Sequence, residues 1–403
     1  MKLLRRISAF FINSRISSLF IMAVAVFALF SFIMTAAWIS DQYYNYSILK
    51  NSKVKNGYIF GTSLYEFIIQ QGNTEVQRRF KENEDLLRNN PLIKDVYTIK
   101  VANHAEYGGG PLSIVLYDKE LLDAFPLLRR YGIDFSSDSN GVIVSGELFR
   151  EMKAGDSIDV VLTNGSQKTP TSLTVAGHMN YPYKFLSFNS VTTELSADDL
   201  FSNIPVMIMQ ANEKVFPLLE NNTRIAYNPD ILFTFKEEAT DEQIENTLTE
   251  LRKIGVVGSI ERVIAKSKEN VLLNVKTFLT RPLFLMIATL IAYLSVVIVM
   301  VFKKRKEIAI EYLCGASKKD ILLTLFGACL VISIVPAVII TIFVLVAPEL
   351  QWKGYYKLSG QLITTDLLWI VAAYFVLTVI VSQAAVLVSI GRKTPLGYLR
   401  GLE

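Results

Sequence analysis

Four apolar runs without a charged residue limit what this sequence can fold into. They cover residues 16–39, 282–302, 321–347 and 367–390. Each has at least about 20 residues, the length that an α-helix needs to cross the hydrocarbon core of a bilayer. Apolar residues make up 51% of the chain, but 19% are charged, too many for a protein made only of spans. The sequence therefore predicts four transmembrane helices combined with a large aqueous domain.

Charge is distributed unevenly between these runs. Residues 1–15 carry about +4, 303–320 about +3 and 391–403 about +2, whereas 41–280 carry about −6. Basic residues beside spans mark the cytoplasmic side of a membrane. We therefore expect both termini and the 303–320 loop in the cytoplasm, and the long acidic segment outside. This division leaves no cationic surface for a nucleic acid.

The first run has a second interpretation, which is a cleaved signal peptide. It is longer than the apolar part of such peptides, and Trp38, Tyr43 and Tyr44 at its end are typical of the aromatic belt of a membrane helix. We therefore expect an uncleaved anchor. The expected segments are a cytoplasmic N-terminus (1–15), the first span (16–39), an extracytoplasmic domain with stalk helices (40–281), the second span (282–302), a cytoplasmic coupling helix and loop (303–320), the third span (321–347), a short outer loop (348–366), the fourth span (367–390) and a cytoplasmic C-terminus (391–403).

Strand-like and helical patterns alternate within the extracytoplasmic segment. Thr240 and Gln243 have the spacing of a capping box, which favours a helix that runs to Arg252. Asn164-Gly165 indicates a hairpin, since both residues tolerate positive φ. The alternation is typical of an α+β domain, here with two lobes and with stalks at 43–70 and 261–280. Further helices are expected at 76–88, 119–128 and 147–153, and strands at 96–101, 112–116, 142–144, 157–162, 171–176, 204–210 and 231–235.

Motifs that carry catalytic chemistry are missing from the sequence. It has no phosphate-binding loop of the GxxxxGK[ST] type, no HExxH and no GxSxG. Its two histidines, His104 and His178, are isolated, and its two cysteines, Cys314 and Cys329, lie outside the aqueous segment. No Asp or Glu occurs in the spans, which disfavours an intramembrane protease or a proton relay. We expect no catalytic, metal-binding or cofactor-binding residue and no enzyme activity in this chain.

The basic stretch between the second and third spans reads KKRKEIAIEYLCGASKKDI at 303–321. Its apolar residues from Ile308 to Leu313 can form a stripe on a short helix, which Gly315 would end. Two interpretations stay open on this pattern alone. The stretch is either a basic hairpin loop that only sets topology, or an amphipathic helix that a cytoplasmic partner binds.

The same stretch resembles a known family. KEIAI at 306–310 followed by CGASKKDI at 314–321 is similar to the corresponding loop of FtsX-like permeases, the membrane subunits of MacB-type ABC systems. PLGYLR at 395–400 resembles the end of these proteins. Segments 153–158 and 173–177 are similar to the periplasmic core domain of the MacB type. The order of one span, an outer domain and three spans is shared as well.

The resemblance has departures within the loop. Glu311, Tyr312 and Cys314 stand where the family usually has other residue types. The resemblance implies that a separate cytoplasmic ATPase subunit docks here, and that Glu307, Ile308, Leu313, Gly315 and Ala316 form the docking surface. This partner would bind ATP and Mg²⁺, because the chain carries no ATPase domain of its own.

The resemblance also implies a function. A homodimer or heterodimer of permeases in the bacterial inner (cytoplasmic) membrane would transmit ATP-driven movement through the stalks to the outer domain. This mechanotransmission would serve export or extraction of a peptide, a drug or a lipoprotein. An alternative is an FtsX-like regulatory subunit that controls an extracytoplasmic protein, such as a cell-wall hydrolase, without transport. A passive outer-surface binding protein is a third, but it leaves the basic motif unexplained.

Overall fold

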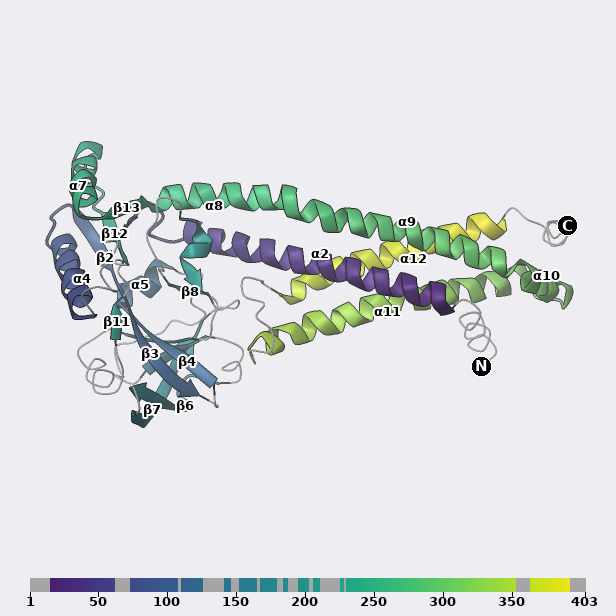
Figure 1. The fold of residues 1–403 in the computed structure, drawn as a ribbon, viewed down its shortest axis with the longest axis horizontal. Coiled ribbons are helices and arrows are strands. Elements are labelled where there is room, and N and C mark those ends of the chain that lie inside the picture. Colours follow the sequence, from purple (N-terminus) through teal and green to yellow (C-terminus); the bar gives the residue numbers. More distant parts are fainter. Residues whose placement is uncertain are drawn as a thin grey trace. The chain divides into compact units, whose positions relative to one another are not determined.

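The computed structural model contains two compact units, a helical unit and an α+β unit (Figure 1). The helical unit comprises Met1–Ile39, Leu273–Gln351 and Gln361–Glu403, and the α+β unit comprises Ser40–Leu272 and Trp352–Gly360. The structure describes residues 15–61, 73–107, 110–125, 141–145, 152–164, 167–179, 184–187, 195–202, 206–210, 225–227, 230–352 and 363–391. The expected cytoplasmic ends at 1–14 and 392–403, and most of the expected helical turn at 147–153, lie outside these ranges.

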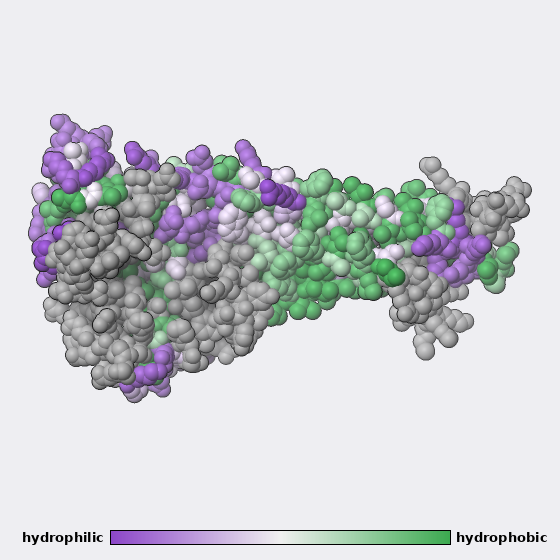
Figure 2. Space-filling model, viewed as in Figure 1, coloured by the Kyte–Doolittle hydropathy of each residue, from purple (hydrophilic) through white to green (hydrophobic). Residues whose placement is uncertain are grey.

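Long apolar helices dominate the helical unit. They are α2 (Arg15–Lys50), α9 (Thr280–Lys303), α11 (Lys318–Trp352) and α12 (Leu368–Gly391), with the single turn η5 (Thr365–Leu367) before α12. Four helices of the described chain are long and apolar enough to cross a membrane. Large apolar side chains also cover their outer surface, among them Phe284 and Trp369, and Figure 2 shows this surface in green. A helix that is apolar on all sides is typical of a membrane span.

The helices of this unit are packed through one buried cluster. It contains Val297 and Val301 of α9, Leu325 of α11 and Val386 of α12. The hydroxyl of Tyr293 in α9 lies inside the cluster, 2.9 Å from the carbonyl oxygen of Cys329 and 2.8 Å from Oγ of Ser333, both in α11. Interhelical hydrogen bonds of this kind satisfy polar groups inside a membrane bundle. The bundle is therefore filled by packed side chains where these helices meet.

The α+β unit contains a four-stranded sheet with the order β13-β1-β12-β2. Its strands are β1 (Tyr58–Gly61), β2 (Ile93–Tyr97), β12 (Asp230–Phe235) and β13 (Val256–Ser259). Two helices, α4 (Asn73–Arg88) and α7 (Asp241–Ile254), bury Phe80, Leu87, Leu248 and Leu251 against it. The predicted capping box of α7 is confirmed, since Thr240 and Gln243 each bond the backbone N–H of the other.

The second sheet has seven strands in the order β11-β3-β4-β10-β5-β7-β6. They are β3 (Ile99–Tyr107), β4 (Gly110–Tyr117), β5 (Gly141–Val144), β6 (Ser157–Asn164), β7 (Gln167–His178), β10 (Val206–Gln210) and β11 (Ile225–Tyr227). The sheet curls until β6 also pairs with β3, Leu162 opposite Ala105. The predicted hairpin is confirmed by the pairing of Asn164 with Gln167. Alternate residues such as Ile114, Val144 and Met209 fill the buried face of this curled sheet.

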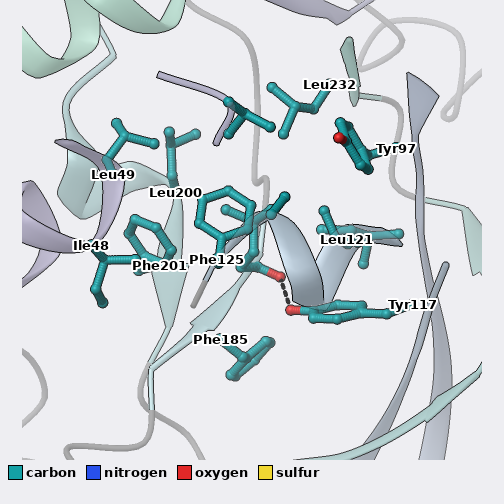
Figure 3. Close-up of a cluster of buried hydrophobic side chains, with 14 of the residues drawn as sticks. Ile48, Leu49, Tyr97, Tyr117, Leu121, Phe125, Phe185, Leu200, Phe201 and Leu232 are labelled. Carbon is teal, nitrogen blue, oxygen red and sulfur yellow. Dashed lines mark hydrogen bonds between the residues drawn. The ribbon is translucent and has the colours of Figure 1, made fainter. Parts of the chain in front are cut away.

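The other face of the curled sheet builds the largest apolar core of the unit (Figure 3). This core also takes side chains from α2, from α5 (Lys119–Ala124), from α8 (Ile260–Asn274) and from the ribbon β8 (Phe185–Leu186) and β9 (Phe201–Ser202). Tyr117 donates its hydroxyl to the carbonyl of Leu186 at 2.7 Å. Burial raises the pKa of this phenol well above its usual value. One neutral, fully buried tyrosine therefore ties the ribbon to the curled sheet.

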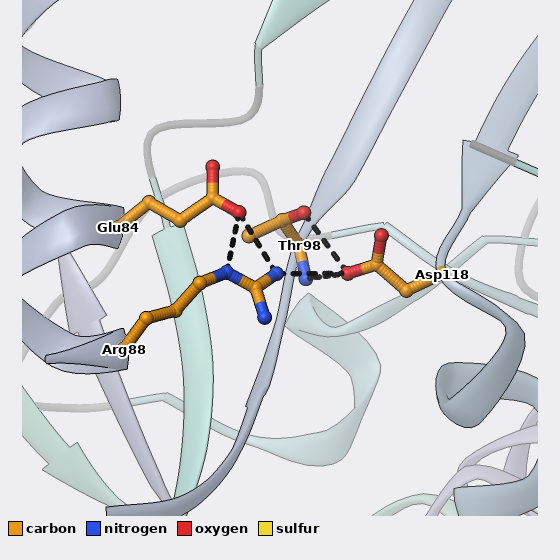
Figure 4. A network of polar contacts seen from close by, with 4 residues as sticks. All are labelled: Glu84, Arg88, Thr98 and Asp118. Atoms are coloured by element: carbon orange, nitrogen blue, oxygen red, sulfur yellow. Dashed lines mark hydrogen bonds and ion pairs between the residues drawn. The ribbon is translucent and has the colours of Figure 1, made fainter. Parts of the chain in front are cut away.

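A small polar network connects the two sheets (Figure 4). Arg88 at the end of α4 bonds Glu84 at 2.8 Å and lies 3.6 Å from Asp118 after β4. Asp118 also accepts the N–H and the hydroxyl of Thr98, which separates β2 from β3. Because the Arg88 side chain is 45% exposed, its ion pairs add at most about 1 kcal/mol, and the network mainly fixes geometry.

The two long helical connections of the α+β unit end on adjacent strands. The chain leaves α2 and enters β1, and it leaves β13 and enters α8. β1 and β13 are antiparallel neighbours, with Tyr58 opposite Ser259, and the N–H of Ile260 bonds the carbonyl of Gly57 at 3.0 Å. Because the start of β1 meets the end of β13, both helices join the sheet at the same end of one strand pair.

A buried polar cluster holds α2 to the rest of the α+β unit. Asp41 of α2 and Lys184, which precedes β8, form an ion pair at 2.7 Å with side chains only 6% and 3% exposed. One helical turn further along α2, Asn45 donates to Asp198 at 2.7 Å, in the 3-10 turn η3 (Ala197–Asp199). Beyond residue 39, the buried side of α2 therefore also contains the polar side chains of Asp41 and Asn45.

The helical stalks expected on both sides of the α+β unit are present at the two connections. α2 continues beyond the first apolar run to Lys50, and one helix runs from Ile260 to Lys303. α11 is longer than the sequence predicts, because it continues through Ala347 to Trp352, into the expected outer loop. In each case the hydrogen-bonded backbone extends beyond the apolar run from which the boundary was inferred.

Five short strands were not predicted. β1 lies within the segment 43–70 that was expected to be partly helical, and β8, β9, β11 and β13 lie where no strand was expected. The expected strand 96–101 is divided between β2 and β3 at Thr98. The unpredicted strands have only two to four residues, and β1 pairs with the distant strand β12, so local periodicity carries little signal for them.

Candidate docking site at the α10 corner

The basic stretch forms a short helix between two spans, as the sequence predicts. α10 (Arg305–Leu313) follows α9 after the single residue Lys304. Its inner side buries Ile308 and Ala309 in the apolar cluster of the helical unit, together with Ile321 and Leu325 of α11. The helix is therefore fixed to the bundle by its own apolar side chains.

The start of α10 is held by charged side chains. Lys304 is 8% exposed and forms an ion pair with Glu307 one turn later. The guanidinium of Arg305 lies over the ring of Phe302, 3.1 Å from its centroid, which is the geometry of a cation–π contact. Lys304 and Arg305 therefore fix the first turn of α10 to the end of α9.

The end of α10 is a Schellman motif. Gly315 adopts φ 91°, its N–H bonds the carbonyl of Tyr312 at 3.0 Å, and the N–H of Ala316 bonds the carbonyl of Glu311 at 2.9 Å. Ala316 and Tyr312 both pack against the apolar cluster, and burial raises the pKa of the Tyr312 phenol. The backbone thus reverses at one defined glycine.

The start of α11 is capped immediately afterwards. Ser317 Oγ accepts the N–H of Asp320 at 3.2 Å, and the carboxylate of Asp320 accepts the N–H of Ser317 at 3.1 Å. This reciprocal pair is a capping box, with Asp in place of the usual Glu. Gly315 and Ser317 together therefore make a rigid corner between α10 and α11.

Gly315→Ala should loosen this corner. A left-handed φ costs a residue with a Cβ about 1–2 kcal/mol, so the corner should open about tenfold more often. Hydrogen exchange at the amides of 314–317 in the full chain would measure this opening. Cys314→Ala is the matched control, because Cys314 has φ −80° and needs no special residue. Equal exchange in both variants would contradict the role of the glycine.

The five residues predicted for docking do not share one surface. Glu307, Leu313 and Gly315 are exposed, whereas Ile308 is buried at 5% exposure and Ala316 is partly buried against the cluster. Sequence reasoning missed Ile310, which is 58% exposed. Glu307, Ile310 and Leu313 follow one another at intervals of three, so they lie along one edge of the helix. We name these three residues the docking edge.

Residues that could hold a metal are not brought together in the part of the chain that the structure describes, where no group of three or more His, Cys, Asp or Glu side chains is found. A ring nitrogen of His178 contacts the backbone oxygen of Met152. Cys314 is exposed in the corner, and Cys329 is buried in α11.

Comparisons with known proteins give structural neighbours only. No family model and no curated protein matches this sequence. The periplasmic region of MacB from Actinobacillus actinomycetemcomitans is similar at 11% identity and a TM-score of 0.32, covering 56% of this chain and 98% of that one. The extracellular domain of YknZ, an ABC-type transporter of Gram-positive bacteria, is similar at 14% identity and a TM-score of 0.28, covering 49% and 91%. These comparisons assign no family to the chain.

Proposed function

We propose that this chain is a permease subunit of an ABC transporter of the mechanotransmission type. The docking edge carries the proposal, because Ile310 and Leu313 are 58% and 72% exposed on a helix that is fixed between two spans. Large apolar side chains beside a charge, on a rigid backbone, are suited to binding a protein partner. The sequence at 306–321 supports the proposal through its resemblance to the loop of FtsX-like permeases.

The partner is a cytoplasmic ABC ATPase, which binds ATP and Mg²⁺ and supplies ATP hydrolysis. Basic residues at 303–319, 1–15 and 391–403 support an orientation with α10 in the cytoplasm and the α+β unit outside a bacterial cell membrane. The chain works in a homodimer or a heterodimer of permeases.

Movement follows the long helices. α2 has 36 residues and is about 54 Å long at 1.5 Å per residue. Its buried residues recur every four positions, from Ile21 and Ala25 in the helical unit to Asn45 and Leu49 in the α+β unit. A displacement of α10 by its partner reaches the strand pair β1–β13 through this helix and through α8. The outer unit then moves a peptide, a drug or a lipoprotein.

Ile310→Asp and Leu313→Asp should each abolish binding of the ATPase. A carboxylate in the centre of an apolar contact loses several kcal/mol, which is more than a hundredfold in affinity. The measurement is co-purification of the ABC ATPase with the full chain in nanodiscs, together with stimulation of its ATP hydrolysis. Ile308→Asp is a poorer test, because it also disrupts the buried cluster.

Leu86→Asp is the matched control for these two variants. Leu86 of α4 is 49% exposed, in the α+β unit, and should leave the complex intact. If both docking-edge variants keep the ATPase and its stimulation, the proposed contact does not exist.

A regulatory role is the second candidate, and the packed bundle favours it. The cluster around Tyr293 fills the space between α9, α11 and α12, and the spans carry no Asp or Glu that could line a path. In this role the outer unit controls an extracytoplasmic protein, such as a cell-wall hydrolase. Leu313→Asp then changes hydrolase activity at the cell surface without changing the accumulation of any peptide or drug.

A further inference from the structure

A π-helical turn lies in the helical unit, two residues after the chain leaves the α+β unit. The turn η4 (Val275–Leu279) connects α8 to α9 within one helix that runs from Ile260 to Lys303. The α+β unit ends at Leu272 and the helical unit begins again at Leu273. The irregular turn therefore lies next to the point where the chain passes from one unit to the other.

The sequence explains why the helix is irregular here. Pro282 has no N–H, so it cannot bond the carbonyl of Phe278 four residues earlier, and its ring crowds that carbonyl. The hydroxyl of Thr280 donates to the carbonyl of Lys276 at 2.5 Å, which gives this carbonyl a donor from a side chain. A proline and a threonine together therefore favour a widened turn over a regular α-helical one.

The surroundings leave the turn room to change. None of its five residues is buried. Phe278, which is 44% exposed, meets Trp38 of α2 edge-on, with ring centroids 5.2 Å apart and planes at 85°. α2, by contrast, is α-helical without interruption from Arg15 to Lys50. The helix that precedes β1 is thus continuous, whereas the helix that follows β13 contains an irregular turn.

We propose that η4 is an adjustable joint, in which the helix exchanges between π and α hydrogen bonding while α2 acts as a rigid strut. Moving one residue into or out of a helical turn changes the phase of the following helix by about 100°. Such a change alters which face α8 presents without breaking the helix. π turns within α-helices often occur at functional positions.

The face of α8 that responds is defined by its contacts within the α+β unit. Ile260, Val263 and Ser267 are the buried residues of α8. Ser267 Oγ accepts the N–H of Ala197 at 2.8 Å, at the first residue of η3. Asp198, the next residue of η3, bonds Asn45 of α2. A rotation of α8 therefore acts on the same short segment that the rigid helix holds.

Hydrogen exchange of the full chain in nanodiscs tests the joint. The amides of 276–281 should exchange about tenfold faster than those of 263–269 in α8, because the joint opens locally. Pro282→Ala restores the missing N–H and should slow exchange at 276–281 about tenfold, to the rate of a regular helix. Adding a donor to a helix does not threaten folding, so the variant is expected to remain intact.

Pro336→Ala in α11 is the matched control, because it also restores an N–H inside an apolar helix but lies far along the chain from η4. It should leave exchange at 276–281 unchanged. Slow exchange there in the wild type, or no effect of Pro282→Ala, would overturn the proposal. The measurement needs neither ATPase nor substrate, so its outcome is independent of the proposed function.

Discussion

Lys184→Met should destabilise the α+β unit by about 3–5 kcal/mol. The substitution leaves the carboxylate of Asp41 without its cation at a position where its side chain is only 6% exposed. A buried charge without a partner loses its hydration and gains little in return. Methionine keeps the volume of the lysine stem, so the loss comes from the charge and not from a cavity.

The double variant Asp41→Asn with Lys184→Met separates these effects. It removes both charges, so most of the stability should return. A denaturant titration of the full chain in nanodiscs, followed by hydrogen exchange at β5 and β10, measures the free energy of unfolding of this unit. If Lys184→Met alone were as stable as the wild type, the ion pair would not anchor α2.

Gly255→Ala should have the second-largest effect, a loss of about 3 kcal/mol. Gly255 lies between α7 and β13, and a Cβ added there would be 2.7 Å from the carbonyl oxygen of Gly61 and 2.7 Å from Cε2 of Phe60. Phe60 is fully buried, so its ring has no space to move away. The backbone of β1 must shift instead, which disturbs its pairing with β13.

Gly258→Ala provides the control for this substitution. Gly258 lies in β13 itself, and nothing is within 4 Å of an added Cβ. The change should therefore alter the unfolding free energy by less than about 0.5 kcal/mol in the same titration. If the two alanine variants are equally stable, close packing at Gly255 is not what the sheet requires.

Local sequence signals predicted much of this fold. The apolar runs gave the four long helices, the capping box at Thr240 gave the start of α7, and Asn164-Gly165 gave the β6–β7 hairpin. Each of these features depends on residues close together in the chain. β1 could not be predicted in this way, because its four residues are stabilised by partners such as Phe233, far along the sequence.

The candidate site was predicted less completely. The helix between the spans and its end at Gly315 follow from the pattern of the stretch. The pattern could not show that Ile308 is buried and Ile310 exposed, because both residues are apolar. Which side of α10 faces the bundle depends on where α11 packs. The π turn could not be predicted either, because its five residues have the same apolar and polar spacing as a regular helix.

The pairing of β1 with β13 determines which motions of α2 and α8 the sheet of the α+β unit resists. Its four residue pairs, from Tyr58 with Ser259 to Gly61 with Val256, join strands whose helical extensions leave from the same end. A force that pulls α2 and α8 in the same direction moves β1 and β13 together and leaves their hydrogen bonds intact. Sliding one helix past the other must break all the pairs together, whereas spreading the helices apart peels them one at a time. This ladder thus resists shear more than separation and would yield first at Tyr58 and Ser259.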